Sequence, residues 1–322
     1  MKGICGLANR GNTCYMNASL QIFSQMHELN HYLLTVQNVK NCADSIVTFE
    51  WIQLFRMIQD NHGSITPNRF IERMRHAAIQ KNRQEFSSGE QNDSVDFFEF
   101  MLECFHNSLN GLDSSIRENR NRENQVEKYL EQIEEKDHSI VSRLFLSGFI
   151  YQYVNPVNMK IEFYKIEHEY HLSLSIPDKS NVTIQDCFME TFKEETLTGE
   201  NAWFDEKENV KKTVLKRSFL CHTPRLLILH FKRWKPNMTK KNNKIDTPFL
   251  LDIQPFTVYK ESCEYQLFGV INHDGGIHGG HYYASIQKEG VWFSVNDHSI
   301  QSIPQEHIIH ESNYCLFYRK IK

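Results

Sequence analysis

The stretch from Gly6 to Gln21 reads GLANRGNTCYMNASLQ and places Cys14 directly after a glycine-containing turn. The apolar residues around and after it recur at helical spacing: Met16, Leu20, Phe23 and Met26. This period predicts a helix from Thr13 to about Met26, with Cys14 in its first turn. Unpaired backbone N–H groups and the positive end of the helix dipole both favour a thiolate there. The stretch therefore predicts a reactive cysteine.

The neighbours of Cys14 decide between a nucleophile and an ordinary buried thiol. Most cysteines are small buried hydrophobes, so a place at a helix start is not enough. Gly11 allows a tight turn just before the thiol, and the Asn9 side-chain amide is expected beside it. An amide there would stabilise the oxyanion of an acyl intermediate. These two residues favour a catalytic role for Cys14.

A second segment, from His273 to Ile286, reads HDGGIHGGHYYASI. It is a glycine-rich loop that runs directly into a strand pattern, and His281 stands at the start of that strand. The glycines on its N-terminal side would let an extended peptide pass close to the imidazole. Among the 16 histidines of the chain, His281 is therefore the candidate base.

A third segment, residues 292–298, reads WFSVNDH. A turn at Gly290 pairs this segment with the strand that starts at His281, so that Asn296 or Asp297 comes alongside the imidazole as its orienting group. A thiol, a base and an orienting amide or carboxylate, far apart in sequence and in this order, form the arrangement of a papain-like hydrolase.

The composition limits the classes of partner. The 322 residues are 40% hydrophobic, and Lys+Arg 36 against Asp+Glu 40 gives a formal net charge of -4. This balance gives no electrostatic reason to expect nucleic acid or a membrane surface as partner. The sequence has no apolar run long enough to span a bilayer, no signal-peptide pattern and no Cys-x-x-Cys pair among its eight cysteines. We expect an intracellular protein with free thiols, in the cytoplasm or the nucleus.

The apolar pattern changes along the chain. Helical spacing dominates the first third, with further patterns at residues 49–58 and 95–109. Residues 113–138 are almost all charged or amide side chains, which indicates a solvated helix or a mobile insertion. After Leu144, short alternating runs such as residues 170–176 predict strands. A helical front and an antiparallel-looking back indicate an α+β domain with a cleft between its halves.

These segments resemble the Cys, His and Asp/Asn boxes of the ubiquitin-specific protease family, deubiquitinating cysteine peptidases of the papain-like superfamily. The most specific matches are GNTCYMN around Cys14 and GGHYYA around His281. Residues 91–98 (QNDSVDFF) resemble the Gln-Gln-Asp box of the family, residues 226–234 (LLILHFKRW) its central palm strand, and residues 314–318 (YCLFY) its closing strand. The resemblance extends over nearly the whole chain.

The resemblance implies a single catalytic domain over residues 1–322 with the shape of a hand. Its parts would be a helical thumb at about 1–110, a charged helical insertion at about 111–140, β fingers at about 145–215 and an antiparallel β palm at about 216–322. Ubiquitin would rest on the fingers. Its C-terminal tail would thread between thumb and palm.

The resemblance also implies the roles of the residues at the scissile bond. Cys14 would be the nucleophile and His281 the general base and then acid. Asn296 would orient the imidazole, Asn9 would donate to the oxyanion, and Asp297 would assist either role. Many members have aspartate where this chain has Asn296, and a neutral amide stabilises imidazolium less than a carboxylate does. We therefore expect a modest rate.

A channel for the ubiquitin tail follows from the same resemblance. Asp93 and Asp96, one helical turn apart, are candidate partners for the basic residues of the tail, and equally good candidates for helix-start carboxylates favoured by the dipole. Backbone at Gly279 and Gly280 would admit an unsubstituted chain most easily. The other channel candidates are Gln91, His273 and Tyr282.

One departure from the family pattern concerns its structural metal. Many members carry two Cys-x-x-Cys pairs that bind zinc at the fingertips. The corresponding residues here, 151–158 (YQYVNPVN) and 201–208 (NAWFDEKE), contain no cysteine. We expect no zinc and no other cofactor, and fingers held by strand pairing and side-chain packing.

Two other functions are open to the sequence. A catalytically silent ubiquitin-binding module would keep the surface without the chemistry, although the presence of Cys14, His281 and Asn296 argues against it. A papain-like enzyme of another kind would be an acyltransferase, which the Cys and Gln-Asp boxes disfavour, or a protease for another ubiquitin-like modifier. The expected partners are ubiquitin and ubiquitinated proteins. A recruiting or activating protein is not identifiable from the sequence.

Overall fold

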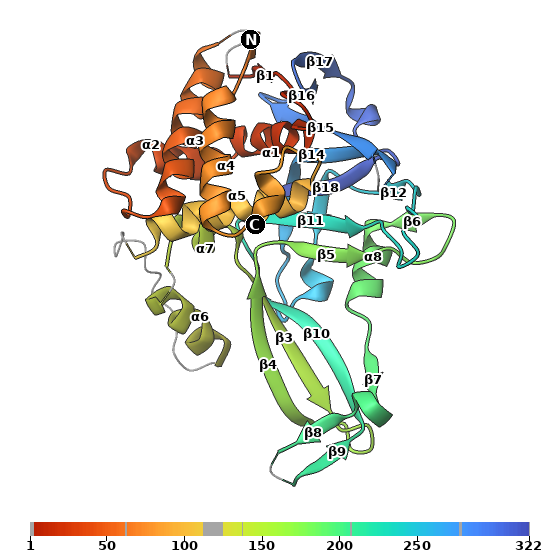
Figure 1. The fold of residues 1–322 in the computed structure, drawn as a ribbon. Coiled ribbons are helices and arrows are strands. Elements are labelled where there is room, and N and C mark those ends of the chain that lie inside the picture. Colours follow the sequence, from red (N-terminus) through yellow and green to blue (C-terminus); the bar gives the residue numbers. More distant parts are fainter. Residues whose placement is uncertain are drawn as a thin grey trace.

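The computed structural model describes residues 3–61, 63–111, 125–136, 138–206, 208–276 and 279–321. Figure 1 shows a helical body beside a large sheet, with a narrow extension of strands that projects away from both. We call these parts the thumb, the palm and the fingers. Most of the helical residues precede Leu146 and most of the strand residues follow it, so the expected α+β class is confirmed.

The thumb is built mainly from the first third of the chain. Its elements are β1 (Gly6–Leu7), α1 (Cys14–Ser24), α2 (His27–Thr35), α3 (Ala43–Asp60), β2 (Ser64–Ile65), α4 (Asn68–Gln80), η1 (Gln84–Phe86), α5 (Ser94–Leu109) and α7 (Ile140–Phe145). The apolar period predicted α1 and α5 well. The helix predicted from Thr13 to about Met26 is shorter in the structure. Helix α1 ends at Ser24, and Met26 directly precedes the first residue of α2.

The palm is a sheet with strand order β17-β16-β15-β14-β18-β11-β5, and β13 pairs with β14. Its strands are β5 (Leu172–Ser175), β11 (Leu226–Lys232), β13 (Leu250–Asp252), β14 (Glu264–Gly276), β15 (Gly279–Lys288), β16 (Val291–Asn296), β17 (Ser299–Ile303) and β18 (Asn313–Lys320). Neighbours pair antiparallel except β5 and β11, which are parallel. The pairs within residues 226–320 are antiparallel, as expected for the palm; the parallel pair adds β5, from the range 145–215 expected for the fingers, and a long connection permits it.

The fingers are an antiparallel sheet with strand order β4-β3-β10-β7. These strands are β3 (Ser147–Val154), β4 (Ile161–Glu169), β7 (Glu195–Leu197) and β10 (Val214–His222), and the hairpin of β8 (Trp203–Asp205) and β9 (Val210–Lys212) lies at the far end (Figure 1). We call this hairpin and the β3–β4 turn the fingertips. The remaining elements are β6 (Val182–Thr183), α8 (Ile184–Thr191), η3 (Gly199–Asn201), β12 (Ile245–Asp246), η4 (Gln254–Phe256) and η5 (Gln305–His307).

The charged segment 113–138 is described only in part. Its described portion contains the helix α6 (Gln125–Lys136), and residues 112–124 and 137 lie outside the described residues. The Tyr129 hydroxyl is 2.9 Å from His168 Nδ1 on β4, and Leu130 is buried. This portion is therefore a helix that packs one face on the protein.

Two apolar cores position the cleft. One lies between the thumb helices and the near face of the palm, where Phe23 stacks on Phe98 with ring centroids 4.0 Å apart. The other fills the far face of the palm and the root of the fingers. Helix α1 packs against β14, β15 and β16, which carries its N-terminal residue to the sheet. None of the helices in the described part of the chain is both long and apolar enough to cross a membrane.

Candidate active site

Cys14 is the first residue of α1, as the sequence predicts. The turn before it uses two left-handed residues, Gly11 (φ 82°) and Asn12 (φ 54°), which are types that tolerate this conformation. The backbone N–H and the hydroxyl of Thr13 both donate to Asn9 Oδ1 at 3.2 Å. The loop is thereby tied to the start of the helix. Cys14 is only 3% exposed, so its thiol is enclosed by the surrounding segments.

Burial raises the pKa of the Cys14 thiol, and the charge of Asp297 raises it further. Backbone hydrogen bonds from Tyr282, Tyr15 and Cys14 itself lower this pKa, but burial is the largest effect. The expectation of a resting thiolate is therefore corrected, because the loss of water around the sulfur outweighs the N–H groups at the helix start. Cys14 needs a base to take its proton.

His281 lies near the start of β15 and contacts the residue that ends β16. Its Nε2 is 2.6 Å from Asn296 Oδ1, whereas the Asp297 carboxylate is 4.0 Å away. With a carbonyl oxygen as partner, Nε2 carries the proton and Nδ1 keeps its lone pair. The antiparallel register, with Ala284 opposite Val295, brings the two segments together. In this geometry Asn296 is the residue within hydrogen-bond reach of the imidazole.

Asp297 instead holds the loop before Cys14 against the palm. Its carboxylate accepts from Asn9 Nδ2 at 3.0 Å and from Asn17 Nδ2 at 2.8 Å. Its backbone oxygen accepts from the Leu7 N–H at 2.8 Å. One Asn9 N–H is used in this way, which leaves the other for an oxyanion. Asp297 therefore fixes the orientation of the expected oxyanion donor.

Gln91 links the thumb to the palm beside the thiol. Its Nε2 donates to the Gly280 backbone oxygen at 2.5 Å and lies 4.0 Å from Cys14 Sγ. Gly280 and Tyr282, whose backbone also contacts the thiol, flank His281 on β15. The thiol, the segment that carries the imidazole, and Gln91 therefore meet at one point between α1 and β15.

His273, on β14, packs under the glycine pair of the His281 segment. A Cβ at Gly280 would meet His273 Nε2 at 2.2 Å, whereas one at Gly279 would meet nothing within 4 Å. Lys240 Nζ holds the other side of His273, 3.0 Å from Nδ1 and 2.6 Å from its backbone oxygen. Burial and then the Lys240 charge lower the pKa of His273 to about 4, so the ring is neutral near pH 7.

The carboxylates of Asp93 and Asp96 have different surroundings. Asp93 caps α5 by accepting from the Val95 N–H at 2.7 Å, and it also accepts the hydroxyls of Tyr314 at 2.5 Å and Tyr282 at 3.3 Å. Its carboxylate is thus committed within the protein. Partial burial and repulsion from neighbouring acids raise the pKa of Asp96. Of the two, Asp96 gains more from an incoming cation.

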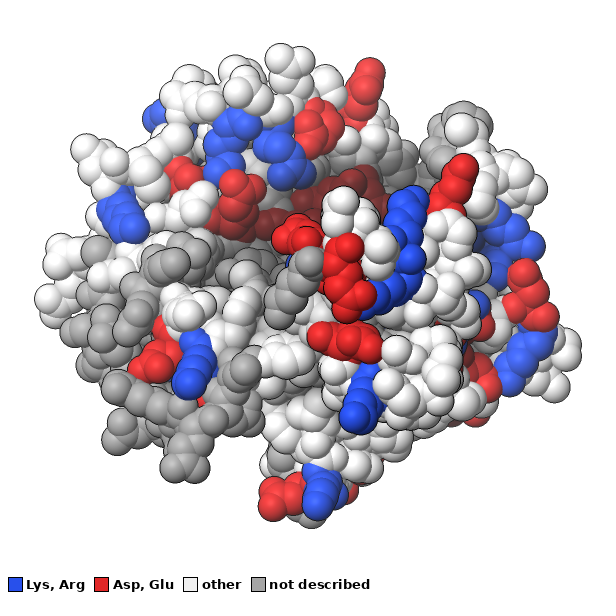
Figure 2. Space-filling model, turned by 90° about the horizontal axis from the view of Figure 1, so that it is seen from below, with Lys and Arg blue, Asp and Glu red and all other residues white. Residues whose placement is uncertain are grey.

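A hollow of about 670 Å³ lies between thumb and palm at this point. Its lining residues are Asn12, Glu90, Gln91, Asn92, Asp93, Trp234, His273, Gly276, Gly279, Gly280 and Tyr282. Every expected substrate-binding residue except Asp96 is among them. Figure 2, seen from the finger side, shows acidic side chains at the bottom of a recess. We call the 670 Å³ hollow the channel.

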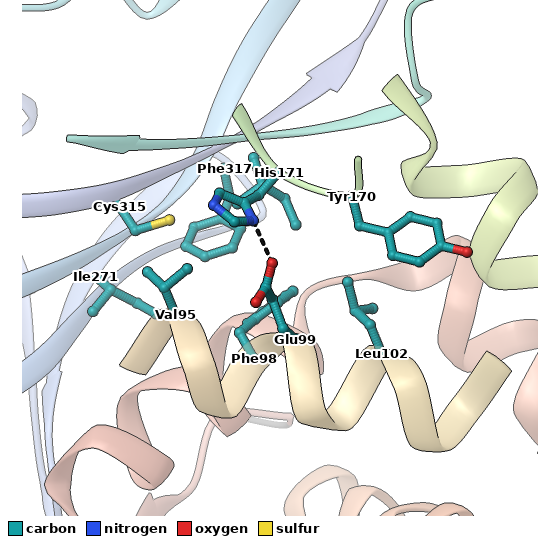
Figure 3. A pocket seen from close by; sticks show the side chains of 10 residues that line it. Val95, Phe98, Glu99, Leu102, Tyr170, His171, Ile271, Cys315 and Phe317 are labelled. Carbon is teal, nitrogen blue, oxygen red and sulfur yellow. Dashed lines mark ion pairs between the residues drawn. The ribbon is translucent and has the colours of Figure 1, made fainter. Parts of the chain in front are cut away.

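A chain of polar side chains connects α5 to the interior of the palm. Figure 3 shows Glu99 reaching from α5 towards His171 in a small pocket with mostly apolar walls, and their ion pair is 2.6 Å long. His171 Nε2 is 3.0 Å from Ser173 Oγ, which is 3.2 Å from His230 Nδ1. Burial lowers the pKa of His230 to about 4. His230 is therefore neutral near pH 7.

Metal ligands and disulfides were also sought. Within the described ranges, no three His, Cys, Asp or Glu side chains are grouped so that they could hold a metal ion. All eight cysteines fall in those ranges and are free thiols, of which Cys42 is exposed and the other seven are buried.

The sequence model of the family described as ubiquitin carboxyl-terminal hydrolase matches residues 5–318. The chain belongs to the ubiquitin carboxyl-terminal hydrolase family. A relative from Acanthamoeba polyphaga mimivirus, named as a probable ubiquitin carboxyl-terminal hydrolase, is 25% identical over 98% of this chain and 90% of its own length. Usp2 of Drosophila melanogaster is 26% identical over 99% of this chain, and human ubiquitin carboxyl-terminal hydrolase 2 is 27% identical over 98%. The chain spans only 35% and 55% of these two proteins.

Solved structures share this fold. The SAGA DUB module that contains Ubp8, Sgf11, Sus1 and Sgf73, bound to monoubiquitin, superposes with a TM-score of 0.79 at 22% identity, over 100% of this chain and 70% of that one. A yeast SAGA DUB module gives a TM-score of 0.78 at 23% identity, over 100% and 69%. At this identity the likeness establishes the fold.

Three side chains of the candidate active site were missed by sequence reasoning. Asn17 and Tyr314 lie inside the quoted motifs, next to the residues that drew attention, so their position in the motif was the available signal. Lys240 lies in a polar stretch and carries no such signal. It is recognised only because it contacts His273 across the fold.

Proposed function

We propose that this protein is a thiol-dependent deubiquitinase, which hydrolyses the isopeptide or peptide bond after the C-terminal glycine of ubiquitin. The observation that carries the proposal is the meeting of Cys14, the His281–Asn296 pair and a glycine-walled channel, from distant segments, at one point. Membership of the family supports ubiquitin as the substrate. Solved relatives bound to monoubiquitin and to ubiquitin aldehyde support the same substrate.

The first half of the reaction forms a thioester. His281 Nδ1 removes the Cys14 proton, and the sulfur attacks the carbonyl carbon of the last ubiquitin glycine. The free Asn9 N–H and the Cys14 backbone N–H stabilise the negative oxygen. The C–N bond breaks as His281 gives the proton to the departing amine. Asn296 accepts from Nε2–H throughout and keeps Nδ1 in place.

The second half of the reaction hydrolyses the thioester. His281 Nδ1 takes a proton from water, whose oxygen attacks the thioester carbonyl carbon. The C–S bond breaks, ubiquitin leaves with a free carboxylate, and His281 returns the proton to Cys14. Because burial raises the pKa of Cys14, the resting site in this proposal holds a neutral thiol, whose proton His281 removes as the reaction begins.

The channel would hold the ubiquitin tail. Gly280 is restricted to glycine by the His273 ring, which leaves backbone on that wall of the channel. Asp96 would accept a basic residue of the tail, because a cation relieves the repulsion from its acidic neighbours. Asp93 would contribute by holding Tyr282 and Tyr314 in position.

We infer that the fingertips need no zinc. The finger sequence offers no cysteine pair for the metal, and an aromatic stack occupies the region instead. Phe163 stacks on Trp203 with ring centroids 6.2 Å apart, and Tyr153 lies 5.8 Å from Phe163. These contacts link β3, β4 and β8, which a metal would otherwise have to join.

We also infer that the protein works inside the cell, in the cytoplasm or the nucleus. Its eight free thiols suit a reducing compartment.

The test of the proposed function is reaction with ubiquitin that carries a C-terminal electrophile. We expect a covalent adduct with the wild type, none with Cys14→Ala, and an unchanged adduct with the control Cys42→Ala, which removes the exposed thiol. A matched probe built on another ubiquitin-like modifier defines the substrate class. Reversible ubiquitin binding without an adduct would mean a silent binding module. An adduct on the other modifier alone would keep the chemistry and replace the substrate.

A further inference from the structure

The thumb carries a second hollow, of about 540 Å³, that the proposed chemistry does not use. One wall is the outer face of α4, and the other is Arg10 in the loop before Cys14. The charged and titratable residues that line it are Arg10, Glu72, Arg73, Arg75 and His76. The hollow is therefore predominantly basic, with Glu72 as its one acid. We call it the basic hollow.

Within the described ranges, the arginines that line the basic hollow form no ion pair with an acidic side chain. Neighbouring arginines do, since Arg69 pairs with Glu50 at 2.9 Å and Arg83 with Glu85 at 2.5 Å. No ion pair joins Arg10, Arg73 or Arg75 to any acid in the part of the chain that the structure describes. The Arg75 Nε is moreover buried without a hydrogen-bond partner. A buried unpaired donor is costly, so this cluster is arranged for a negative group that comes from outside.

The loop before Cys14 contributes a residue to both the basic hollow and the channel. Asn12 lines the channel and Arg10 lines the basic hollow, two residues apart in the loop before Cys14. Asn12 Nδ2 donates to the Gly89 backbone oxygen at 3.3 Å, and the Arg75 guanidinium lies against Gly89 from the other side. The channel side carries Glu90 and Asp93. The loop of the nucleophile thus lines both a hollow with acidic residues and a hollow with basic ones.

We propose that the basic hollow binds an acidic segment of the protein to which ubiquitin is attached. This inference rests on the proposed function. The acidic channel suits the basic tail of ubiquitin, and a conjugate brings its second protein to the other side of the scissile bond. The opposite charge of the basic hollow selects carboxylate-rich sequence there, because arginine pairs bidentately with carboxylates. Ile79, 58% exposed at the rim, adds an apolar contact for a side chain within that segment.

The expected effect is moderate and depends on salt. Arg10 and Arg73 are exposed, and exposed ion pairs each contribute little. Two or three pairs together should favour an acidic conjugate over a neutral one by roughly threefold to tenfold. The preference should act through KM, because the arginines do not touch the reacting atoms. It should shrink as added salt screens the charges.

The experiment compares two conjugates and one small substrate. Ubiquitin is joined through an isopeptide bond to a lysine peptide flanked by glutamates, or to the same peptide with glutamines. Ubiquitin with a small C-terminal fluorophore reports the reaction without a second protein. We expect the wild type to prefer the glutamate conjugate. The double variant Arg10→Glu/Arg73→Glu should reverse or abolish this preference, and Arg10→Gln/Arg73→Gln should abolish it.

Controls separate this inference from the proposed function. Both double variants should hydrolyse the fluorophore substrate like the wild type, and Lys260→Glu, which changes an exposed charge on the palm, should keep the preference. A wild type without preference, or a preference that survives in Arg10→Glu/Arg73→Glu, would overturn the inference alone. No hydrolysis of the fluorophore substrate would overturn the proposed function. In that case, binding of the free glutamate peptide decides the inference. Tighter binding by the wild type than by Arg10→Glu/Arg73→Glu supports it, and equal binding overturns it.

Discussion

The active-site cleft and the fingertips are held together in different ways. In the cleft, short directional hydrogen bonds join distant segments, such as the 2.6 Å contact between His281 and Asn296. At the fingertips, flat rings pack on one another, and Phe163 and Trp203 lie with their planes only 13° apart. A hydrogen bond tolerates little displacement, whereas packed rings accept other apolar groups. Substitutions in the cleft should therefore change rates, and substitutions at the fingertips should change local stability.

Among variants that keep the Cys14 thiol, the largest effect is expected from Asn296→Ala. Without the carbonyl that accepts from Nε2–H, His281 loses its fixed tautomer and orientation. We expect kcat to fall by roughly 10-fold to 100-fold, which is about 1.4 to 2.7 kcal/mol, with little change in KM. The measurement is steady-state hydrolysis of ubiquitin with a C-terminal fluorophore.

Two variants sharpen this result. Asn296→Asp should keep or raise kcat, because a carboxylate stabilises imidazolium better than an amide does. Trp203→Ala, at the fingertips, should leave kcat within about twofold of wild type. An equal kcat for Asn296→Ala and Trp203→Ala would contradict the expectation that cleft substitutions change rates and fingertip substitutions do not. It would point to Asp297, 4.0 Å from the imidazole, as the orienting group.

The sequence predicted those parts of the site whose chemistry needs particular residue types next to one another. Cys14 at a helix start and His281 after a glycine loop are of this kind, and the structure brings their segments together. The pKa of Cys14 was expected to fall and instead rises, because burial in the packed fold outweighs the N–H groups at the helix start. The capping role of Asp93 and the contact of Lys240 with His273 likewise depend on the packed fold.

The fold, like the candidate site, was predicted only in part from the sequence. Long periodic segments, such as α5, were recognisable because their apolar face is continuous. The helix α8 was missed because it has only eight residues. The parallel pairing of β5 with β11 was missed because strand direction depends on how the chain returns from the fingers, which local alternation does not encode.

The next effect is a loss of stability in mild acid that arises at His230, in the interior of the palm. The pKa of His230 is about 4 in the folded state, against about 6.5 when unfolded. The unfolded chain therefore binds more protons below pH 6.5, so stability is complete above that pH and falls as pH approaches 4. We expect a loss of about 1 to 2 kcal/mol between pH 7 and pH 5. Chemical denaturation across this range measures it.

The control for this acid effect is His230→Gln. It is compared with the wild type by the slope of the free energy of unfolding against pH, and not by its absolute stability. The slope should become shallower without vanishing, because His273 also has a pKa of about 4 and titrates in the same window. The fingertip sequences, residues 151–164 and 200–212, contain no histidine. An unchanged slope in His230→Gln would assign the acid sensitivity to other groups.

A smaller effect is expected from Asp96→Lys, at the acidic side of the cleft. The substitution removes the proposed partner of the basic ubiquitin tail and should raise KM for ubiquitin substrates by roughly tenfold, with kcat little changed. Because Asp96 is repelled by its acidic neighbours, thermal stability should not fall. Asp60→Lys, an exposed acid on α3, is the control. Reversing the charge at Asp93 should instead lower the Tm, since its carboxylate caps α5. An unchanged KM in Asp96→Lys would show that Asp96 does not bind the ubiquitin tail.

The smallest effect is expected at the fingertips, from Trp203→Ala. Phe163, the partner of Trp203, is 45% exposed, so the stack buries only part of each ring. Its loss should cost about 0.5 to 1 kcal/mol and lower the Tm by a few degrees at most. A chelator should leave both the Tm and kcat of the wild type unchanged, because ring packing takes the place of a metal in this proposal. A Tm that drops with chelator and recovers with zinc would show that the fingertips, like the cleft, depend on ligands of fixed geometry.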